Sequence, residues 1–593
     1  MATADKNRGL RFIPWAAAVL ACGFILCVLI AVPRPDSISA RLTSGIILTN
    51  AVPVIFLFLA CYLIFRRILT TSLLIVFICL LITIGNSFKF SVVSQPVIAS
   101  DFILAGQVLA NPKLFGKYFL EQWYLFPLLA IVLVLPIWTL YIEPPLLKHK
   151  AWAISLALLG IALLWQAENL LLKPEAPLQK IYKSRLPEFD HRQAMQQVEQ
   201  YGLFATLINA ARKSYFQLPE VTSQQQALIT ELESLTKQSA VQQDQNLPNI
   251  VIILNEAFFD FRVIDPAFPK NAYRIWDQLK QSSQHGLVTV DTYGGATLRT
   301  EFTVLTGIPL SWFGPEMDYP YLTVVKNPMH ALPQHLKQLS YHTTAIHPYI
   351  KTFWRRHLAY PRLGFDTFLS RKNFGKYSVD GPYISDQVVC KTILKQIKKS
   401  DQPDFIFAVT MENHGPWSFD RKQRGSLNEF KLDNYEFDGD VALQLKRYLY
   451  HAQNAAKMAH CLTEGLTQLS RPSTLLFFGD HAPAMPSVYK AFAVDNPWHE
   501  PKLLQVPYLL WRSDSSASKN QDTNISHLPD MLLQKSRLPQ DRFFRLSNYL
   551  RQHCLSNQAA SNRCPKKPTV TMRALINERL QPKKIKTEQM HSN

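Results

Sequence analysis

The chain has 593 residues, which is too long for a single domain. Its 63 basic and 44 acidic side chains give a formal net charge of +19, which suits an anionic partner such as nucleic acid or anionic lipid headgroups. The basic residues are spread over loops, linker and tail without a recognisable nucleic-acid-binding module, so we predict no nucleic-acid partner.

Five apolar stretches occupy the first third of the chain. They have roughly the 17–25 residues that span a bilayer core, the last being slightly short, and none has the polar face of a buried helix in a soluble domain. The predicted membrane helices are 12–32, 45–65, 68–84, 123–142 and 151–165. One such stretch could be a signal peptide, but five in series cannot.

Clusters of basic residues predict the orientation of these helices. They precede the first helix, fill the second loop and precede the fifth helix: Lys6, Arg8, Arg11, Arg66, Arg67, Lys148 and Lys150. All three clusters fall on one side of the membrane if the N-terminus is cytoplasmic. We therefore predict a multi-pass membrane domain over 1–168, with the rest of the chain outside the cytoplasm.

The chain after the membrane domain divides by composition into three parts. Residues 169–247 are polar and glutamine-rich, with apolar residues at helical spacing such as Leu203 and Leu207, and we expect a helical linker, partly amphipathic on the membrane surface. Residues 248–550 form the predicted catalytic domain. Residues 551–593 form a basic tail, predicted to be disordered from about Lys566 and to contact anionic lipid.

Short β-branched runs separated by helical segments characterise residues 248–550. The runs are 249–254, 285–293, 341–346, 404–410, 473–479 and 506–511. Strands that alternate with helices predict an α/β fold with a mainly parallel sheet covered by helices on both faces. In such folds the active site lies beyond the carboxyl ends of the strands.

Every predicted strand except the last is followed by side chains capable of metal binding, nucleophilic attack or acid–base chemistry. These residues are Asn255, Glu256, Thr297, His347, Glu412, Asn413, His414, Asp480 and His481. Each alone has a simpler interpretation, such as a helix cap or a core histidine. Their coincidence at one sheet edge predicts an active site.

The types of these residues suggest metal-assisted chemistry at a phosphate. Glu256, Asp480 and His481 suit a divalent metal, and the Thr297 hydroxyl can complete the shell and become an activated nucleophile. Thr297 follows a Gly-Gly pair at the predicted start of a helix, a position that favours a bound anion. The simpler interpretation is a glycine turn that leads into an ordinary helix capped by threonine. His414 and His347 can orient a phosphate oxygen or protonate a leaving group.

The segment FWRR, residues 353–356, supplies a second candidate binding element. Arg356 can hold a phosphate through two parallel hydrogen bonds, and Trp354 offers a flat wall for a small polyol or amine headgroup. An exposed basic helix start is the equally simple alternative.

The motifs NEAF, GGATLRTEF, FWRR, ENHGP and FGDHAP, taken in order, resemble the lipoteichoic acid synthase and phosphoglycerol transferase family. That family belongs to the alkaline phosphatase and sulfatase superfamily, and its members combine five membrane spans with an extracytoplasmic catalytic domain in the bacterial cytoplasmic (inner) membrane. The resemblance implies metal ligands, a covalently loaded threonine and headgroup-binding residues. These are Glu256, Thr297, Asp480 and His481 for the metal, Thr297 for the loading, and Trp354, Arg356 and His414 for the headgroup.

The implied reaction moves glycerol phosphate from phosphatidylglycerol to Thr297 and then to an extracytoplasmic glycan, polymer or protein. The implied cofactor is one divalent ion, Mn²⁺ or Zn²⁺, with Mg²⁺ as a further option. Two departures concern the donor: Ala296 stands where these synthases often carry lysine, so Arg299 is expected to supply the charge, and HPYIKT lacks an acidic residue for a glycerol hydroxyl.

Three alternatives compete with a phosphoglycerol transferase. A phosphoethanolamine transferase acting on lipopolysaccharide, glycan or protein, with phosphatidylethanolamine as donor, shares the topology and the threonine. A sulfatase is disfavoured because a threonine cannot become formylglycine. A non-catalytic lipid-sensing homologue predicts missing ligands, whereas all four are present.

Eight cysteines complete the sequence-based expectations. Four lie in the predicted spans and are expected to be core-like: Cys22, Cys27, Cys61 and Cys79. Cys390 and Cys461 are isolated in the sequence. Cys554 and Cys564 form either a small disulfide loop or a pair of free thiols.

Overall fold

The computed structural model describes the greater part of both halves of the chain. The described residues are 11–30, 44–93, 95–99, 101–102, 106, 125–146, 150–190, 193–213, 221–236, 246–310, 319–398, 401–432, 434–554 and 567–580. Lys6, Arg8, Lys148 and Cys564 lie outside them, as does the basic tail after residue 580. The chain forms two compact units, Met1–Phe216 with Gly314–Glu316, and Gln217–Phe313 with Met317–Asn593.

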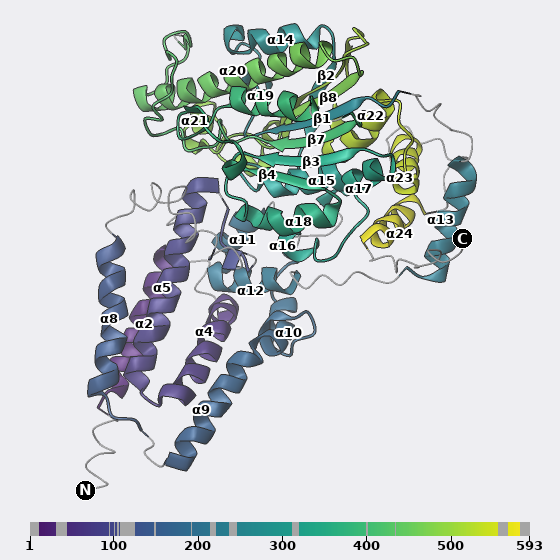
Figure 1. Cartoon of the computed structure of the whole chain (residues 1–593). Helices are drawn as coiled ribbons and strands as arrows, with labels where there is room; N and C mark the ends of the chain where they lie inside the picture. The colour runs from purple at the N-terminus through teal and green to yellow at the C-terminus, as the bar shows by residue number, and fades with distance from the viewer. Residues whose placement is uncertain are drawn as a thin grey trace. The chain divides into compact units, whose positions relative to one another are not determined.

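Each of the five predicted membrane stretches falls on a helix of the first unit. The helices are α2 (Ile13–Ile30), α4 (Ser44–Phe65), α5 (Ile68–Val93), α8 (Leu125–Ile142) and α9 (Lys150–Trp165). Helices α2 and α8 pack against α5, and α9 packs against α4 (Figure 1). Among the described residues, two helices are long and apolar enough to cross a membrane, through Gly45–Phe65 and Ile68–Phe90, and the other three apolar helices are shorter.

The predicted linker is helical. Its elements are η2 (Glu168–Leu172), α10 (Gln179–Lys183), α11 (Ala194–Tyr201), α12 (Leu203–Lys213) and α13 (Ser223–Thr236). The first four belong to the first unit and α13 to the second. Leu203 and Leu207 are buried, as expected for the apolar face of an amphipathic helix.

A nine-stranded sheet forms the centre of the second unit. Its strands are β1 (Asn249–Asn255), β2 (Gln284–Thr289), β3 (His342–His347), β4 (Thr367–Ser370), β7 (Asp404–Val409), β8 (Ser473–Gly479), β9 (Gln505–Arg512), β10 (Lys519–Asn520) and β11 (Thr523–Asn524). They are ordered β10-β2-β9-β8-β1-β7-β3-β4, with β11 beside β2. All six predicted strands are present, and the short strands β4, β10 and β11 are additional.

The central strands are parallel, as predicted. Ile252 of β1 pairs with Phe407 of β7 and Leu476 of β8. Strand β9 runs antiparallel to both β8 and β2, so β2 shares the direction of the central strands. The reversal of β9 explains why, among the six predicted strands, this one alone is followed by no candidate site residue: its carboxyl end lies at the opposite edge of the sheet.

Helices cover both faces of this sheet, which explains the uninterrupted apolar runs of β1, β7 and β8. Helices α14 (Arg274–Lys280), α19 (Asp386–Ile397) and α20 (Gly439–Thr467) lie on one face. Helices α15 (Thr297–Thr306), α17 (Leu332–Gln338) and α18 (Arg356–Leu363) lie on the other (Figure 1), where α22 (Leu528–Lys535) also packs against α15.

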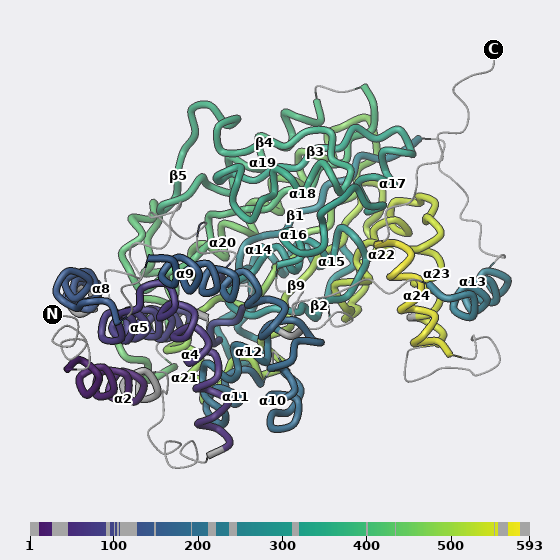
Figure 2. Tube along the Cα trace, turned by 90° about the horizontal axis from the view of Figure 1, so that it is seen from below, coloured from purple at the N-terminus to yellow at the C-terminus, as the bar shows by residue number. Residues whose placement is uncertain are grey.

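The expectation of disorder from Lys566 is wrong for residues 568–580. They form α24 (Pro568–Leu580), which packs with α13 and α23 (Arg542–His553), and Figure 2 shows the three helices gathered at one end of the unit. Leu575 and Ile576 are buried, and the buried guanidinium of Arg579 pairs with Asp541 at 3.0 Å. The basic composition of the tail gave no indication that these apolar side chains form one buried face of a helix.

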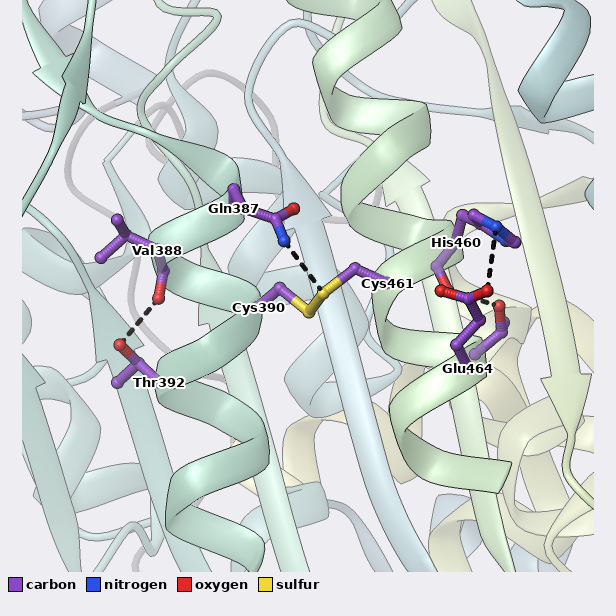
Figure 3. The surroundings of a disulfide bond; sticks show 8 residues. Gln387, Val388, Cys390, Thr392, His460, Cys461 and Glu464 are labelled. Atoms are coloured by element: carbon purple, nitrogen blue, oxygen red, sulfur yellow. Dashed lines mark hydrogen bonds and ion pairs between the residues drawn. A yellow bond between two sulfur atoms is a disulfide. The ribbon is translucent and has the colours of Figure 1, made fainter. Parts of the chain in front are cut away.

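A disulfide between Cys390 and Cys461 joins α19 to α20 (Figure 3). These cysteines are 71 residues apart, so nothing in the sequence indicated that they pair. The packing of α19 against α20 brings them together. Cys554 is also disulfide-bonded. Cys22, Cys61 and Cys79 are free; Cys61 and Cys79 are buried as expected, whereas Cys22 is exposed.

Replacing Cys390 and Cys461 together by serine is expected to destabilise the second unit. A crosslink closing a loop of this length stabilises a protein by about 4 kcal/mol in the chain-entropy model. Differential scanning calorimetry should therefore show a lower unfolding temperature for the double variant. The matched control, Cys22→Ser, removes a free thiol and should leave that transition in place; equal unfolding temperatures for all three proteins would contradict this account.

Candidate active site

Three predicted metal ligands converge where β1 and β8 end. The ligand atoms of Glu256, Asp480 and His481 lie within 4.8 Å of one another, and all three side chains are buried. Glu256 follows β1 directly, and Asp480 and His481 follow β8. Because these strands are adjacent and parallel, residues far apart in the sequence meet at the sheet edge.

The turn after β8 orients Asp480 and His481. A side chain at Gly479 would place its Cβ 2.0 Å from the carbonyl oxygen of Phe258, so only glycine fits there. Asp480 Oδ1 accepts hydrogen bonds from the backbone N–H groups of Ala257 (2.8 Å) and His481 (3.0 Å). His481 Nδ1–H donates to the carbonyl of Ala482 (3.0 Å), which leaves the Nε2 lone pair available.

Thr297 completes this group from the start of α15. Gly294 and Gly295 have φ values of 71° and 159°, and Ala296 is left-handed at 61°, so the chain turns sharply into the helix. The Thr297 hydroxyl donates to Glu256 Oε2 at 3.3 Å. The predicted nucleophile therefore lies beside the predicted metal ligands at a helix N-terminus.

Two further hydrogen bonds fix this loop to the turn after β8. The backbone N–H of Gly294 donates to the carbonyl of Ala482 (3.0 Å), and the Thr300 hydroxyl donates to the carbonyl of Asp480 (2.9 Å). The separation of Thr297 from Asp480 is thus set by the backbone on both sides of the site.

The pKa values of Glu256, Asp480 and His481 are shifted by burial and by the charges that these side chains place beside one another. Burial and Glu256 raise the pKa of Asp480 to about 7. Burial opposes protonation of His481, but Asp480 and Glu256 together raise its pKa to about 9. Burial would likewise raise the pKa of Glu256, but His414, His481 and Arg356 lower it. Two carboxylates this close repel each other until a positive charge lies between them.

The residues fit a divalent metal ion. Asp480 Oδ2 and His481 Nε2 are buried and make no hydrogen bond among the described residues. They lie 3.2 Å apart, and Glu256 Oε1 lies 3.4 Å from the same nitrogen, so a proton on Nε2 or a metal ion is needed to satisfy the three atoms. Two carboxylates, one imidazole nitrogen and the Thr297 hydroxyl are donors that Mn²⁺ and Zn²⁺ accept, and Mg²⁺ accepts the oxygen atoms.

Arg356 is fully buried and paired with Glu301, a carboxylate that the strand-end pattern does not point to. Its guanidinium donates from Nε to both oxygens of Glu301 (3.0 and 3.2 Å). The hydroxyl groups of Tyr321 (3.1 Å) and Tyr360 (2.8 Å) also donate to Glu301. Glu301 lies four residues after Thr297, on the same face of α15, and this spacing was the available signal.

His347 supports Arg356 from the end of β3. Its Nδ1–H donates to the carbonyl of Val409 (3.1 Å), and its Nε2 accepts from Arg356 Nη1 (3.2 Å). Burial and the charge of Arg356 hold the pKa of His347 well below its usual range. We therefore interpret His347 as a neutral partner of Arg356 rather than as a proton donor.

Replacing Glu301 by glutamine is expected to destabilise the catalytic domain by about 3–5 kcal/mol, because the Arg356 charge stays buried without its counter-ion. Urea unfolding followed by tryptophan fluorescence measures the change. The matched variant combines Glu301→Leu with Arg356→Met, which removes both charges and should be more stable than Glu301→Gln. If Glu301→Gln unfolds at the same urea concentration as the native protein, the pair is not a structural element.

His414 and Trp354 each lie against an aromatic ring. His414 Nδ1–H donates to the carbonyl of Gly415 (2.9 Å), leaving Nε2 to exchange protons, and the His414 ring lies 5.7 Å from Tyr383. Trp354 stacks on Tyr319 at 5.5 Å and is left-handed at φ 54°. Such backbone strain costs about 1–3 kcal/mol and clusters at functional sites.

Arg299 lies on the first turn of α15, two residues after Thr297, and is half-buried. That Arg299 supplies the positive charge which a lysine at position 296 would supply stays a prediction.

The part of the chain that carries this site is similar to known proteins. Residues 248–532 match the Sulfatase family. The chain is 27% identical over 435 residues to the capsular polysaccharide biosynthesis protein RkpI of Rhizobium meliloti, covering 70% of this chain and 72% of that protein. It is 25% identical over 211 residues to the lipoteichoic acid synthase-like protein YvgJ of Bacillus subtilis, covering 35% of this chain and 32% of that protein.

Among solved structures, the phosphoglycerol transferase GacH of Streptococcus pyogenes, in complex with sn-glycerol-1-phosphate, is similar in fold. The match has a TM-score of 0.49 and 23% identity, and covers 62% of this chain and 93% of that chain. The family match and the YvgJ match confirm the resemblance expected from the motifs.

Proposed function

Residues 248–532 form a sulfatase-family domain, and from this premise we propose that the protein is a membrane-bound, metal-dependent phosphoglycerol transferase. Glycerol phosphate passes from phosphatidylglycerol to Thr297 and then to a hydroxyl of an extracytoplasmic acceptor. The observation that carries the proposal is the Thr297 hydroxyl, 3.3 Å from Glu256, at the N-terminus of α15 beside the buried, closely grouped ligand atoms of Asp480 and His481.

The residues of the chain support two successive in-line displacements. Glu256, Asp480, His481 and Thr297 would hold a divalent cation, which when bound would lower the pKa of the Thr297 hydroxyl. The hydroxyl proton of Thr297 passes to water. Thr297 Oγ1 attacks phosphorus, and the bond from phosphorus to the diacylglycerol oxygen breaks with its electron pair. His414 Nε2 gives this oxygen a proton. An acceptor hydroxyl then returns a proton to His414 and attacks phosphorus, which releases Thr297.

Arg356 and Trp354 are assigned to the headgroup. Arg356 lies near enough to Glu256 to lower the pKa of that carboxyl, so a phosphate beside Thr297 lies within the field of its guanidinium. The buried Glu301 fixes the direction of this guanidinium. Trp354, half-buried and stacked on Tyr319, offers a flat apolar surface to the glycerol carbons.

A threonine nucleophile favours phosphoryl transfer over sulfate ester hydrolysis, because threonine cannot be converted to formylglycine. A glycan acceptor is supported by the name of RkpI, a capsular polysaccharide biosynthesis protein. The five predicted spans and the basic clusters support an inner-membrane protein with an extracytoplasmic catalytic domain. The Cys390–Cys461 disulfide supports the same location, because such bonds persist outside the reducing cytoplasm.

A phosphoethanolamine transferase is the second candidate, and Tyr349 is the observation that favours it. Position 349 carries a ring rather than an acidic residue for glycerol hydroxyls, and this ring lies 5.5 Å from Phe353 and 6.3 Å from Tyr383. Aromatic faces attract an ammonium group by about 0.5–2 kcal/mol.

Headgroup competition separates the two candidates. The purified full-length protein is supplied with phosphatidylglycerol labelled in its acyl chains, and released diacylglycerol is measured with and without excess unlabelled phosphatidylethanolamine. The proposal predicts diacylglycerol release that phosphatidylethanolamine leaves unchanged. Release only from labelled phosphatidylethanolamine would replace the proposed donor, and release from neither lipid would end the proposal.

A further inference from the structure

The loop after β7 carries His414, and its backbone is held by one buried arginine. Arg421 donates to three carbonyl oxygens of this loop: those of Glu412 (2.8 Å), His414 (2.6 Å) and Pro416 (3.0 Å). Its Nε also donates to His451 Nε2 on α20 (3.2 Å). A planar guanidinium that spans three carbonyls fixes the path of the loop on both sides of His414.

The second component of this network is the Glu412 carboxylate, which is also buried. Its Oε2 accepts from the backbone N–H of Asp386, the first residue of α19 (2.7 Å). Its Oε1 accepts from His451 Nδ1 (2.9 Å) and from Asn454 Nδ2 (2.8 Å), both on α20. Glu412 therefore connects the carboxyl end of β7 to two helices on one face of the sheet.

Asp380, Glu412 and His451 lie close enough to suggest a second metal site. The hydrogen-bond roles argue against one. Arg421 can only donate, so His451 Nε2 must accept and His451 Nδ1 must carry the proton that it donates to Glu412. Both imidazole nitrogens are thus in use. Burial lowers the pKa of His451, in keeping with a neutral ring.

The Cys390–Cys461 disulfide holds the two helices of this network together. Cys390 lies one turn after Asp386 on α19, and Cys461 lies ten residues after His451 on α20. Figure 3 shows the bond between the two helices. A covalent bond therefore links the two helices that supply donors to Glu412.

We infer that Glu412 and Arg421 are positioning residues that hold His414 in its place for catalysis. The inference rests on the proposed function, in which His414 exchanges protons with the leaving and attacking oxygens. Neither side chain takes part in the chemistry; the Glu412–His451–Arg421 chain of hydrogen bonds acts through the backbone of the His414 loop. Misplacement of a catalytic group by about 1 Å can lower a rate by roughly 10²-fold.

The test is a double-mutant cycle in the full-length protein, measured as headgroup transfer. Glu412→Gln offers one acceptor oxygen where the carboxylate offers two, and Arg421→Lys cannot span three carbonyls. Each should lower kcat by roughly 10–100-fold with little change in KM, and bound metal should stay at the native level. In a His414→Ala background, Glu412→Gln should cost less than about twofold, because the positioned group is gone.

Tyr450→Phe is the matched control. Tyr450 precedes His451 on α20, and its hydroxyl donates to Asp380 at 2.7 Å and accepts from the backbone N–H of Gly425 at 3.0 Å, outside the segment that carries His414. This variant should transfer at the native rate. An equal loss from Glu412→Gln with and without His414 would identify a merely structural role and overturn the inference.

Amide hydrogen exchange supplies a readout that does not depend on activity. Glu412→Gln and Arg421→Lys should speed exchange in the peptide 411–417 by about tenfold or more, and leave the peptide that follows β8 unchanged. If the native protein transfers no headgroup, the proposed function is wrong, but the inference about Glu412 and Arg421 is still tested by the amide exchange rates. Native exchange rates at 411–417 in both variants would overturn it.

Discussion

The Thr297→Ala protein is expected to lose headgroup transfer almost completely. Removing a covalent nucleophile costs about 10⁴–10⁶-fold in kcat, because the remaining binding and electrostatic groups cannot form the intermediate. Thr297 is the first residue of α15, and its hydroxyl donates to a residue outside that helix, Glu256. The fold of the variant should therefore be unchanged, and the loss should lie in kcat rather than in folding.

Thr297→Ser is the control for this prediction. It keeps a hydroxyl at the same position and lacks one methyl group, so it should retain transfer within about tenfold of the native rate. Release of diacylglycerol measures both variants. Substantial transfer by Thr297→Ala would show that another group is the nucleophile.

Asp480→Asn is expected to lose bound metal together with transfer, by about 10³-fold or more at limiting metal. Glu256, His481 and Thr297 cannot replace the charge of the missing carboxylate. Elemental analysis of the purified protein measures metal content, and the matched variant Asp514→Asn changes a partly exposed carboxylate that pairs with Arg512 at 2.6 Å, far along the sequence from the cluster. Native metal content in Asp480→Asn would contradict the assignment.

The same cluster predicts that metal affinity rises with pH. In the metal-free protein the pKa of Asp480 is about 7 and that of His481 is about 9, so both are protonated at low pH and a metal must displace those protons. Affinity should therefore increase most steeply between about pH 6 and pH 9. Titration with Mn²⁺ or Zn²⁺ at several pH values tests this, and a flat profile would contradict it.

The free energy of unfolding of the metal-free protein should fall as the pH rises. The pKa of Asp480 in the folded protein lies above its usual value of 3.8, so ionising Asp480 above that value costs stability. In the presence of a chelator at pH 8, Asp480→Asn should unfold at a higher temperature than the native protein.

Much of the catalytic domain could be predicted because its signals are local. The strands β1, β7 and β8 are short apolar runs, and their carboxyl ends carry Glu256, His414, Asp480 and His481. The parallel direction of these strands then brings the side chains to one edge. The position of Thr297 at a helix start could be predicted because a Gly-Gly pair directly before a helical segment lets the backbone turn sharply and approach an anion closely.

The remaining features depend on packing between distant segments. The role of Glu301 becomes visible only when α18 brings Arg356 against α15, 55 residues along the chain. The Cys390–Cys461 bond needs the pairing of α19 with α20. Helix α24 escapes prediction because composition does not reveal that Leu575 and Ile576 pack against other helices.

Mass spectrometry of the Thr297 peptide, after exposure of the full-length protein to total bacterial membrane lipid, tests the central claim most directly. The account predicts a peptide carrying one glycerol phosphate on Thr297, absent from Thr297→Ala and lost when acceptor is added. Lipid turnover with the modification on another residue, or with no covalent modification at all, would contradict it.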